Sequence, residues 1–300
     1  MAAFTPRVFL LGLSALTMSA VALGCGDPEY NPVIICHNAN CEEPTNPEDD
    51  SSMESLLQSL QLFDDERSRP FYDGMEVDTF WWGEEGKCLF AHDLDHPERA
   101  VEAMVAIDAI NDVLAERHNN GIALTRSHDR FTVLIELKGH VGPSKAEAHS
   151  EAELVSHAGC GIELGSALTE QASTLGYQVE VVFMSFTPAL LQALHDHPDY
   201  QGLRDQGFPV RLTVLQGIPR PLDSQTVELD QFPDDIGIDM ISLHPHWARD
   251  PLYEAARSRG MELGFWMFNI VPETLRAIEV YQPTYITTSQ APSLVSWLER

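Results

Sequence analysis

The chain has 300 residues, 44% of them apolar, which is enough for one large α/β domain with a sizeable core. Its formal net charge of -28 argues against nucleic acid or an anionic membrane surface as the main binding partner, because both attract positive charge. We interpret the excess as a solvated acidic surface. An anionic substrate would then need positive charge supplied locally, by a metal ion or by a few lysine and arginine side chains.

The N-terminal segment has the pattern of a secretory signal. Arg7 precedes a run of apolar and small residues that ends at Gly24-Cys25. The sequence Ala22-Leu23-Gly24-Cys25 resembles the lipobox of bacterial lipoproteins, in which the cysteine is lipidated and becomes the first residue. We therefore expect residues 1–25 to be a signal peptide with a lipobox and Cys25 to be the lipidation site. The protein would be exported and anchored in a membrane by lipid, facing the periplasm or the cell exterior; the alternative is secretion without a lipid anchor.

Four cysteines remain after Cys25. An even number permits disulfides in an exported chain, and four cysteines allow three pairings. Two of them flank a short segment and could close a small loop, whereas zinc is less favoured because no Cys-x-x-Cys spacing occurs. The four are Cys36, Cys41, Cys88 and Cys160.

Short apolar runs alternate with segments of helical period after a tether at residues 26–32. We expect one helix at 97–117, starting near Pro97, and another over 145–176 with breaks at Gly159 and Gly161. Four later helices share a proline followed by an apolar stripe, and residues 42–52 read as a polar loop. Strands are expected at 31–37, 74–80, 87–92, 131–138, 178–186, 209–215, 238–244, 261–268 and 283–289.

This alternation predicts a parallel sheet covered by helices. Roughly eight βα units over about 250 residues match a TIM (β/α)8 barrel, here a single domain at residues 33–300. The alternative is a doubly wound open sheet. That fold usually has a glycine-rich phosphate loop after its first strand, and none follows residues 31–37.

Polar residues fall at the ends of several expected strands, where a barrel has its active site. Residues i and i+2 of a strand point the same way, so Glu76 and Asp78 share a face, as do Glu136 and Lys138. Three carboxylates meeting there would repel one another unless a cation lies between them. Oxygen ligands alone suit Mg²⁺ or Ca²⁺ rather than zinc. The alternative for each pair is an exposed strand face, since charged residues are mostly at the surface.

Histidines occur at the same strand ends. His37 closes the first strand, and His92 with Asp93 follows the third. His244 and His246 end another strand, where substrate contact and a polar strand terminus are both open interpretations.

The motifs in order resemble the glycerophosphodiester phosphodiesterase family. That family has His-Arg at its first strand, Glu-x-Asp at the second, His-Asp after a short hairpin, Glu-x-Lys at the third, a Ser-Phe strand, a Trp-x-x-Asn strand and a closing Thr-Asp-x-Pro turn. The resemblance covers about residues 33–299. It rests on VIICHNAN, DGMEVDTFWWGEEGKCLFAHD, TVLIELK, VVFMSFTPALLQALHDHP and RGMELGFWMFNIVPETLRAIEVYQPTYITTSQAP.

The resemblance implies a TIM barrel, a divalent metal and a role for each matching residue. Glu76, Asp78 and Glu136 would hold the metal. His37 and His92 would be the general acid and base.

It also implies residues that bind the substrate. Lys138 would face the phosphate, and Trp266 and Asn269 would line the pocket. Asn38 stands where the family has arginine, so one phosphate-neutralising charge is missing. Ser289 stands where the family has aspartate in the closing turn.

Three functions remain open on this reading. The first is an exported metal-dependent phosphodiesterase that hydrolyses glycerophosphodiesters to glycerol phosphate and an alcohol. The second is a phospholipase similar to sphingomyelinase D, acting on intact phospholipids; that type also lacks the His-Arg pair and tends to carry a disulfide beside the site. The third is a weakened barrel lipoprotein that acts as a binding protein. The expected partners are therefore a small phosphodiester or phospholipid headgroup and a membrane, but not nucleic acid.

Overall fold

The computed structural model describes residues 30–42, 51–83, 85–92, 100–139, 150–216, 236–245, 250–266 and 270–300. The expected signal peptide, Cys25, most of the tether, His246 and Asn269 lie outside these residues. The chain divides into Met1–Tyr30 and a compact unit, Asn31–Arg300. None of the described helices is long and apolar enough to cross a membrane.

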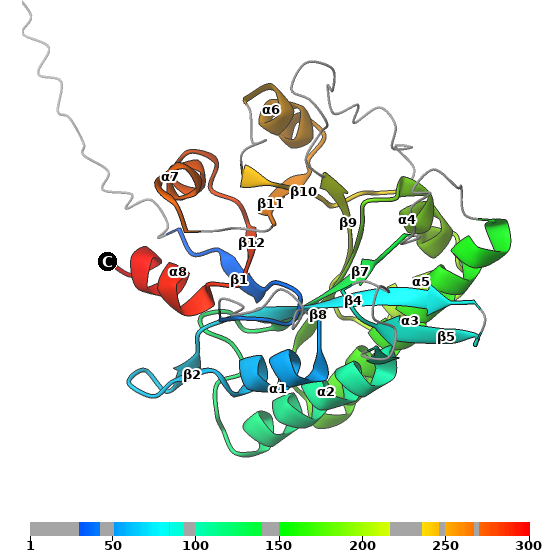
Figure 1. Cartoon of the computed structure of the whole chain (residues 1–300), viewed down its shortest axis with the longest axis horizontal. Helices are drawn as coiled ribbons and strands as arrows, with labels where there is room; N and C mark the ends of the chain where they lie inside the picture. The colour runs from blue at the N-terminus through cyan, green and yellow to red at the C-terminus, as the bar shows by residue number, and fades with distance from the viewer. Residues whose placement is uncertain are drawn as a thin grey trace, which may run out of the picture. The chain divides into compact units, whose positions relative to one another are not determined.

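Eight parallel strands of the compact unit form a closed barrel (Figure 1). Closure depends on the pairing of β1 with both β12 and β4, which excludes the doubly wound open sheet. The TIM-barrel prediction is therefore confirmed. In order around the barrel the strands are β1 (Val33–Cys36), β12 (Tyr285–Thr288), β11 (Glu262–Phe265), β10 (Met240–Leu243), β9 (Val210–Gln216), β8 (Val179–Ser185), β7 (Phe131–Leu137) and β4 (Gly74–Trp82).

The helices lie outside the ring of strands (Figure 1). As expected, proline opens the first turn of α4, α7 and α8, where its missing N–H costs no hydrogen bond. The described helices are α1 (Met53–Gln61), α2 (Ala103–Asn119), α3 (Glu151–Leu175), α4 (Pro188–His195), α5 (Tyr200–Arg204), α6 (Asp250–Ser258), α7 (Pro272–Tyr281) and α8 (Ala291–Leu298).

One helix was missed, and two expectations about helices were wrong. Helix α1 was not expected from the sequence. Helix α2 begins at Ala103 rather than near Pro97, because the short strand β6 (Val101–Glu102) precedes it and pairs with β5 (Lys87–Phe90). Helix α3 is continuous through Gly159 and Gly161. A Cβ on Gly161 would lie 3.1 Å from Leu194 Cδ1, so this glycine allows close packing of α3 rather than breaking it.

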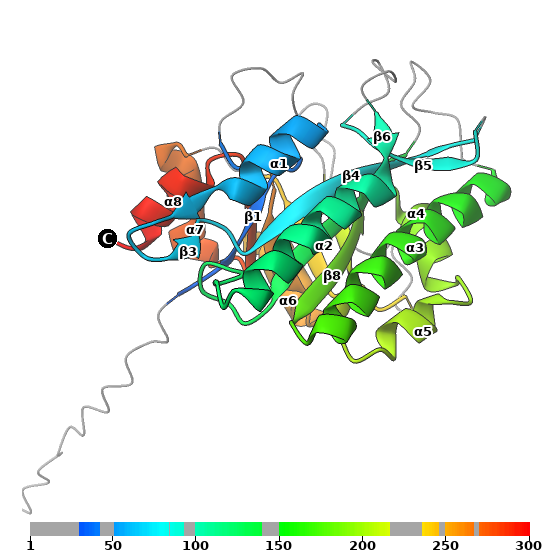
Figure 2. The same cartoon turned by 90° about the horizontal axis from the view of Figure 1, so that it is seen from below.

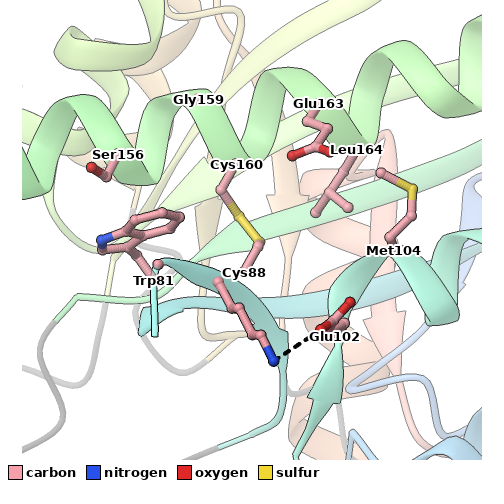
Figure 3. Close-up of a pocket in the computed structure, with 11 residues that line it drawn as sticks. Trp81, Cys88, Glu102, Met104, Ser156, Gly159, Cys160, Glu163 and Leu164 are labelled. Carbon is pink, nitrogen blue, oxygen red and sulfur yellow. Dashed lines mark ion pairs between the residues drawn. A yellow bond between two sulfur atoms is a disulfide. The ribbon is translucent and has the colours of Figure 1, made fainter. Parts of the chain in front are cut away.

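The β4–β5 hairpin forms an arm that runs beyond the barrel (Figure 2). A disulfide from Cys88 on β5 to Cys160 on α3 ties this arm to the helix layer (Figure 3). Beside the disulfide is a cavity of about 490 Å³, lined among others by Trp81, Met104 and Leu164. The second disulfide joins Cys36 and Cys41, which confirms the expected small loop and leaves no cysteine among these four for zinc. A separate two-stranded sheet consists of β2 (Phe63–Asp64) and β3 (Arg69–Pro70).

The barrel interior has an apolar middle between two polar ends. At the start of the strands, Glu180 accepts hydrogen bonds from Tyr285 (2.8 Å) and Thr132 (3.2 Å), and Arg211 Nε lies 2.8 Å from the Glu180 carboxylate. Polar groups at this end of a TIM barrel contribute to stability rather than to catalysis. The apolar middle contains Val33, Ile35, Leu134, Val182, Met184, Leu215, Met240 and Tyr285.

Candidate active site

Two neighbouring strands bring three acids together at the carboxyl end of the barrel. In the register of β4 with β7, Asp78 lies opposite Glu136, and Glu76 lies one inward-facing position earlier on β4. All three carboxylates are buried, and each offers an oxygen within 4.8 Å of the others. The expected convergence of Glu76, Asp78 and Glu136 is thus present in the fold.

Lys138 lies directly after β7 and continues its inward face. Its backbone N–H donates to the Thr79 carbonyl at 2.9 Å, which fixes the backbone beside β4. Its Nζ lies 3.2 Å from Glu136 Oε2 and 3.3 Å from Asp78 Oδ2. Burial alone would lower the pKa of Lys138, but the charges of Asp78, Glu136 and Glu76 outweigh it and raise that pKa. The lysine therefore carries a permanent positive charge in the site.

One lysine cannot neutralise three acids, and the pKa values of two of them, Glu76 and Glu136, are raised. Burial, followed by repulsion from Asp78 and Glu136, raises the pKa of Glu76 well above its ordinary value. Burial is also the main reason that the pKa of Glu136 rises to about 7, although Lys138 opposes the rise. A divalent cation between the carboxylates would offset the free-energy cost of holding their negative charges together in a buried site.

The donor set fits such a cation. Asp78 Oδ1 is buried and has no hydrogen-bond partner among the described residues. Together with Glu76 and Glu136 it offers only carboxylate oxygen, which suits Mg²⁺ or Ca²⁺.

The segment after β1 covers the acids. His37 donates its backbone N–H to the Thr288 carbonyl, and its Nε2 lies 4.0 Å from Glu76 Oε2. The next residue, Asn38, is buried in a left-handed conformation (φ 49°) and donates its backbone N–H to Glu76 Oε2 at 3.1 Å. The Cys36–Cys41 disulfide closes this loop.

His37 is largely buried near the acids and lies within electrostatic reach of His92. The pKa of His37 is lowered to about 4, mainly by burial; the charge of Asp78 opposes this shift, and the charges of Lys138 and His92 add to it. His92 follows β5 and is exposed, and the Ala91 N–H next to it donates to the Asp78 carbonyl at 3.3 Å. The arm thus brings His92 to the same mouth as His37.

Aromatic rings line another part of the mouth. Trp266 follows β11 and packs on the apolar middle of the barrel. Its ring centroid lies 5.0 Å from Phe186, which follows β8 and is exposed, and 5.9 Å from His244, which follows β10. Phe186 was not among the expected site residues, although its place directly after a buried strand was a signal for it.

Ser51 is a second site residue that the sequence did not indicate. Its hydroxyl donates to Asp78 Oδ2 at 2.9 Å, and both groups are buried. It lies just before Ser52, the N-cap of α1, a helix that was itself not expected.

The comparisons with known proteins concern the fold. A proposed glycerophosphodiester phosphodiesterase from Galdieria sulphuraria matches with a TM-score of 0.56 and 16% identity, over 90% of this chain and 98% of that one. The chain has the fold of the glycerophosphodiester phosphodiesterases. A phosphodiesterase from Oleispira antarctica, in complex with the product sn-glycerol-3-phosphate, matches with a TM-score of 0.53 and 10% identity, over 90% of this chain and 97% of that one. A proposed glycerophosphoryl diester phosphodiesterase from Silicibacter pomeroyi DSS-3 matches with a TM-score of 0.51 and 16% identity, over 89% and 94% of the two chains. No family model and no curated protein matches the sequence.

Proposed function

We propose that the protein is an exported, metal-dependent phosphodiesterase that hydrolyses glycerophosphodiesters to glycerol phosphate and an alcohol. The observation that carries this proposal is the buried cluster of Glu76, Asp78 and Glu136 at the catalytic end of the barrel, with Lys138 and two histidines around it. A purely structural role does not explain so many ionisable groups in one mouth. The shared fold with phosphodiesterases agrees with this assignment.

The three acids would hold Mg²⁺ or Ca²⁺, which when bound withdraws charge from phosphate oxygens. Lys138, already fixed by Asp78 and Glu136, adds positive charge beside the phosphate. Because Asn38 supplies no charge where the similar family has arginine, neutralisation of the phosphodiester depends more on the cation and on a protonated histidine. We therefore expect a steep metal requirement.

The different surroundings of the two histidines suit them to different proton transfers. His37 is neutral near pH 7, since burial lowers its pKa to about 4, and its imidazole can accept the proton of the attacking hydroxyl or water. His92 is exposed directly after β5, where the arm returns to the barrel, and would donate a proton to the leaving alkoxide. Each positioned proton transfer typically contributes about 10²–10⁴ to the rate.

Export and anchoring are part of the proposal. The secretory pattern and the resemblance of residues 22–25 to a lipobox support a lipid on Cys25. A Cys25→Ser variant should be released from the membrane fraction and should no longer incorporate radiolabelled fatty acid. Persistence of both membrane association and label would contradict the anchor without affecting the enzymatic assignment.

A phospholipase similar to sphingomyelinase D is the second candidate. Two features support this candidate: the disulfide directly beside His37, and Asn38 in place of arginine. The two activities are separated by measuring choline release from sn-glycero-3-phosphocholine and from sphingomyelin vesicles, with and without exhaustive chelation. Chelation-sensitive release from the water-soluble diester supports the first candidate, release from vesicles alone supports the second, and no release from either contradicts both.

A further inference from the structure

Ser51 links the β1–α1 segment to an acid of the candidate metal site. Its hydroxyl donates to Asp78 Oδ2 over 2.9 Å, and Lys138 Nζ lies 3.3 Å from the same oxygen. The other oxygen of Asp78, Oδ1, is buried without a hydrogen-bond partner in the part of the chain that the structure describes. The two oxygens of this carboxylate therefore have different surroundings, and Oδ1 is the one available to a cation.

The backbone of Ser51 is held in place at some cost. Its φ of 52° lies in the left-handed region, which is unfavourable for a residue with a side chain. Its N–H donates to the Asn38 carbonyl at 2.8 Å, and the Asn38 N–H in turn donates to Glu76 Oε2. The loop that the Cys36–Cys41 disulfide closes thus contacts Glu76 through Asn38, and Ser51, hydrogen-bonded to that loop, contacts Asp78.

We propose that Ser51 is a positioning residue for the metal site, whose hydroxyl orients Asp78 so that Oδ1 faces the cation. This inference rests on the proposed metal-dependent function. Groups that orient metal ligands typically contribute about 10–100-fold to metal affinity. Without the hydroxyl, Asp78 keeps Lys138 as a partner but loses the contact that fixes its rotation, and we expect a loss of affinity in that range.

The substitution Ser51→Gly separates the hydroxyl from the backbone. Glycine accepts a positive φ without strain, so this variant removes the donor while making the loop conformation easier to adopt. A matched control is Ser68→Gly, because Ser68 has nearly the same φ, 55°, but is exposed in the turn between β2 and β3. A role of Ser51 in loop structure alone predicts unchanged affinity and equal or higher thermal stability for Ser51→Gly.

The experiment is calorimetric titration of the metal-free full chain with Mg²⁺ and, separately, with Ca²⁺, alongside melting curves. We expect 10–100-fold weaker binding for Ser51→Gly, and wild-type affinity for Ser68→Gly. Ser51→Ala provides the same test if the glycine variant does not fold. Wild-type affinity in a folded Ser51→Gly or Ser51→Ala variant overturns the inference and leaves the proposed function standing. Failure of the wild-type chain to bind either ion overturns the metal-dependent function, and the inference with it.

Discussion

Asp78 and Glu136 lie opposite each other in the parallel register of β4 and β7, and both are buried. Their carboxylates share one lysine, since Lys138 Nζ contacts an oxygen of each. With Glu76 two residues before Asp78 on the same inward face, the barrel carries more negative charge at this end than the lysine can balance. This charge imbalance should lower the stability of the metal-free protein and favour the binding of a cation.

Replacing Glu76 with glutamine should stabilise the metal-free protein and disable the metal site. The pKa of Glu76 is raised because burial and the neighbouring acids disfavour its charge, so above its ordinary pKa a carboxyl group at this position opposes folding of the metal-free protein. Glutamine removes this charge and retains an oxygen for the Asn38 N–H. For a domain of this size, about 1 kcal/mol corresponds to roughly 2–4 °C in Tm, and we expect an increase of that order.

The same variant should lose the stabilisation that Mg²⁺ or Ca²⁺ gives the wild-type protein, and should lose most activity. Differential scanning calorimetry with and without the ion measures the stabilisation, and a phosphodiesterase assay measures the activity. Glu116→Gln is the control, because Glu116 is exposed in the last turn of α2 and is not one of the three acids. A metal-free Tm below that of the wild type would contradict the charge imbalance.

Metal affinity should rise with pH through the range around pH 7 in which Glu136 loses its proton. Burial raises the pKa of Glu136 to about 7 from an ordinary value of 4.5, so below pH 7 the cation must displace a proton. For one proton the affinity changes by at most about tenfold per pH unit. Calorimetric titrations between pH 5.5 and 8.5 test this, since proton release also makes the binding enthalpy depend on the buffer.

The stability of the metal-free protein should change with pH in the opposite direction to the metal affinity. A raised pKa means that the contribution of Glu136 is fully present below pH 4.5 and is lost as the pH rises through about 7. Metal-free Tm should therefore fall across this window, and saturating metal should reverse the trend. A metal affinity that is flat across the window would show that Glu136 is not a ligand.

Removing the imidazole of His92 should reduce turnover without affecting the metal. His92 is exposed beyond the acids, and its influence on His37 is electrostatic. We expect kcat of His92→Ala to fall about 10²–10⁴-fold, with the Kd for the ion unchanged. His195→Ala is the matched control, because His195 ends α4 and pairs with Asp196. Unchanged turnover in His92→Ala would reject its role as a proton donor.

The sequence predicted those parts of the fold that depend on local pattern. Each expected strand corresponds to an observed one within a few residues, and the i, i+2 spacing was sufficient to place Glu76 with Asp78 and Glu136 with Lys138 on inward faces. Their convergence followed from barrel geometry, because the ends of neighbouring parallel strands meet at one rim.

The rest depended on tertiary contacts that leave little trace in sequence. Gly159 and Gly161 read as helix breakers, but α3 continues through both, and at Gly161 the neighbouring side chains leave little space for a Cβ. Ser51 is one serine beside another, and only the fold places its hydroxyl against Asp78. The pairing of Cys88 with Cys160 was one of several possibilities until the β4–β5 arm was placed against α3.

The two disulfides should have separable effects. Cys36–Cys41 spans 5 residues and Cys88–Cys160 spans 72, and loop entropy predicts contributions to unfolding free energy of about 2 and about 4 kcal/mol, respectively. The short loop holds Asn38 and, through it, Ser51 against the acids, whereas the long one ties the arm to α3. The double alanine variant of Cys36 and Cys41 should therefore lose more metal affinity but less stability than that of Cys88 and Cys160.

Each double variant serves as the control for the other, with denaturant unfolding and calorimetric metal titration as the measurements. The arm carries His92, so loss of the Cys88–Cys160 bridge should also lower kcat while the Kd for the ion stays near the wild-type value. Equal losses of metal affinity in the two variants would mean that the disulfides act only through global stability. The short loop would then have no specific role in orienting Glu76 and Asp78.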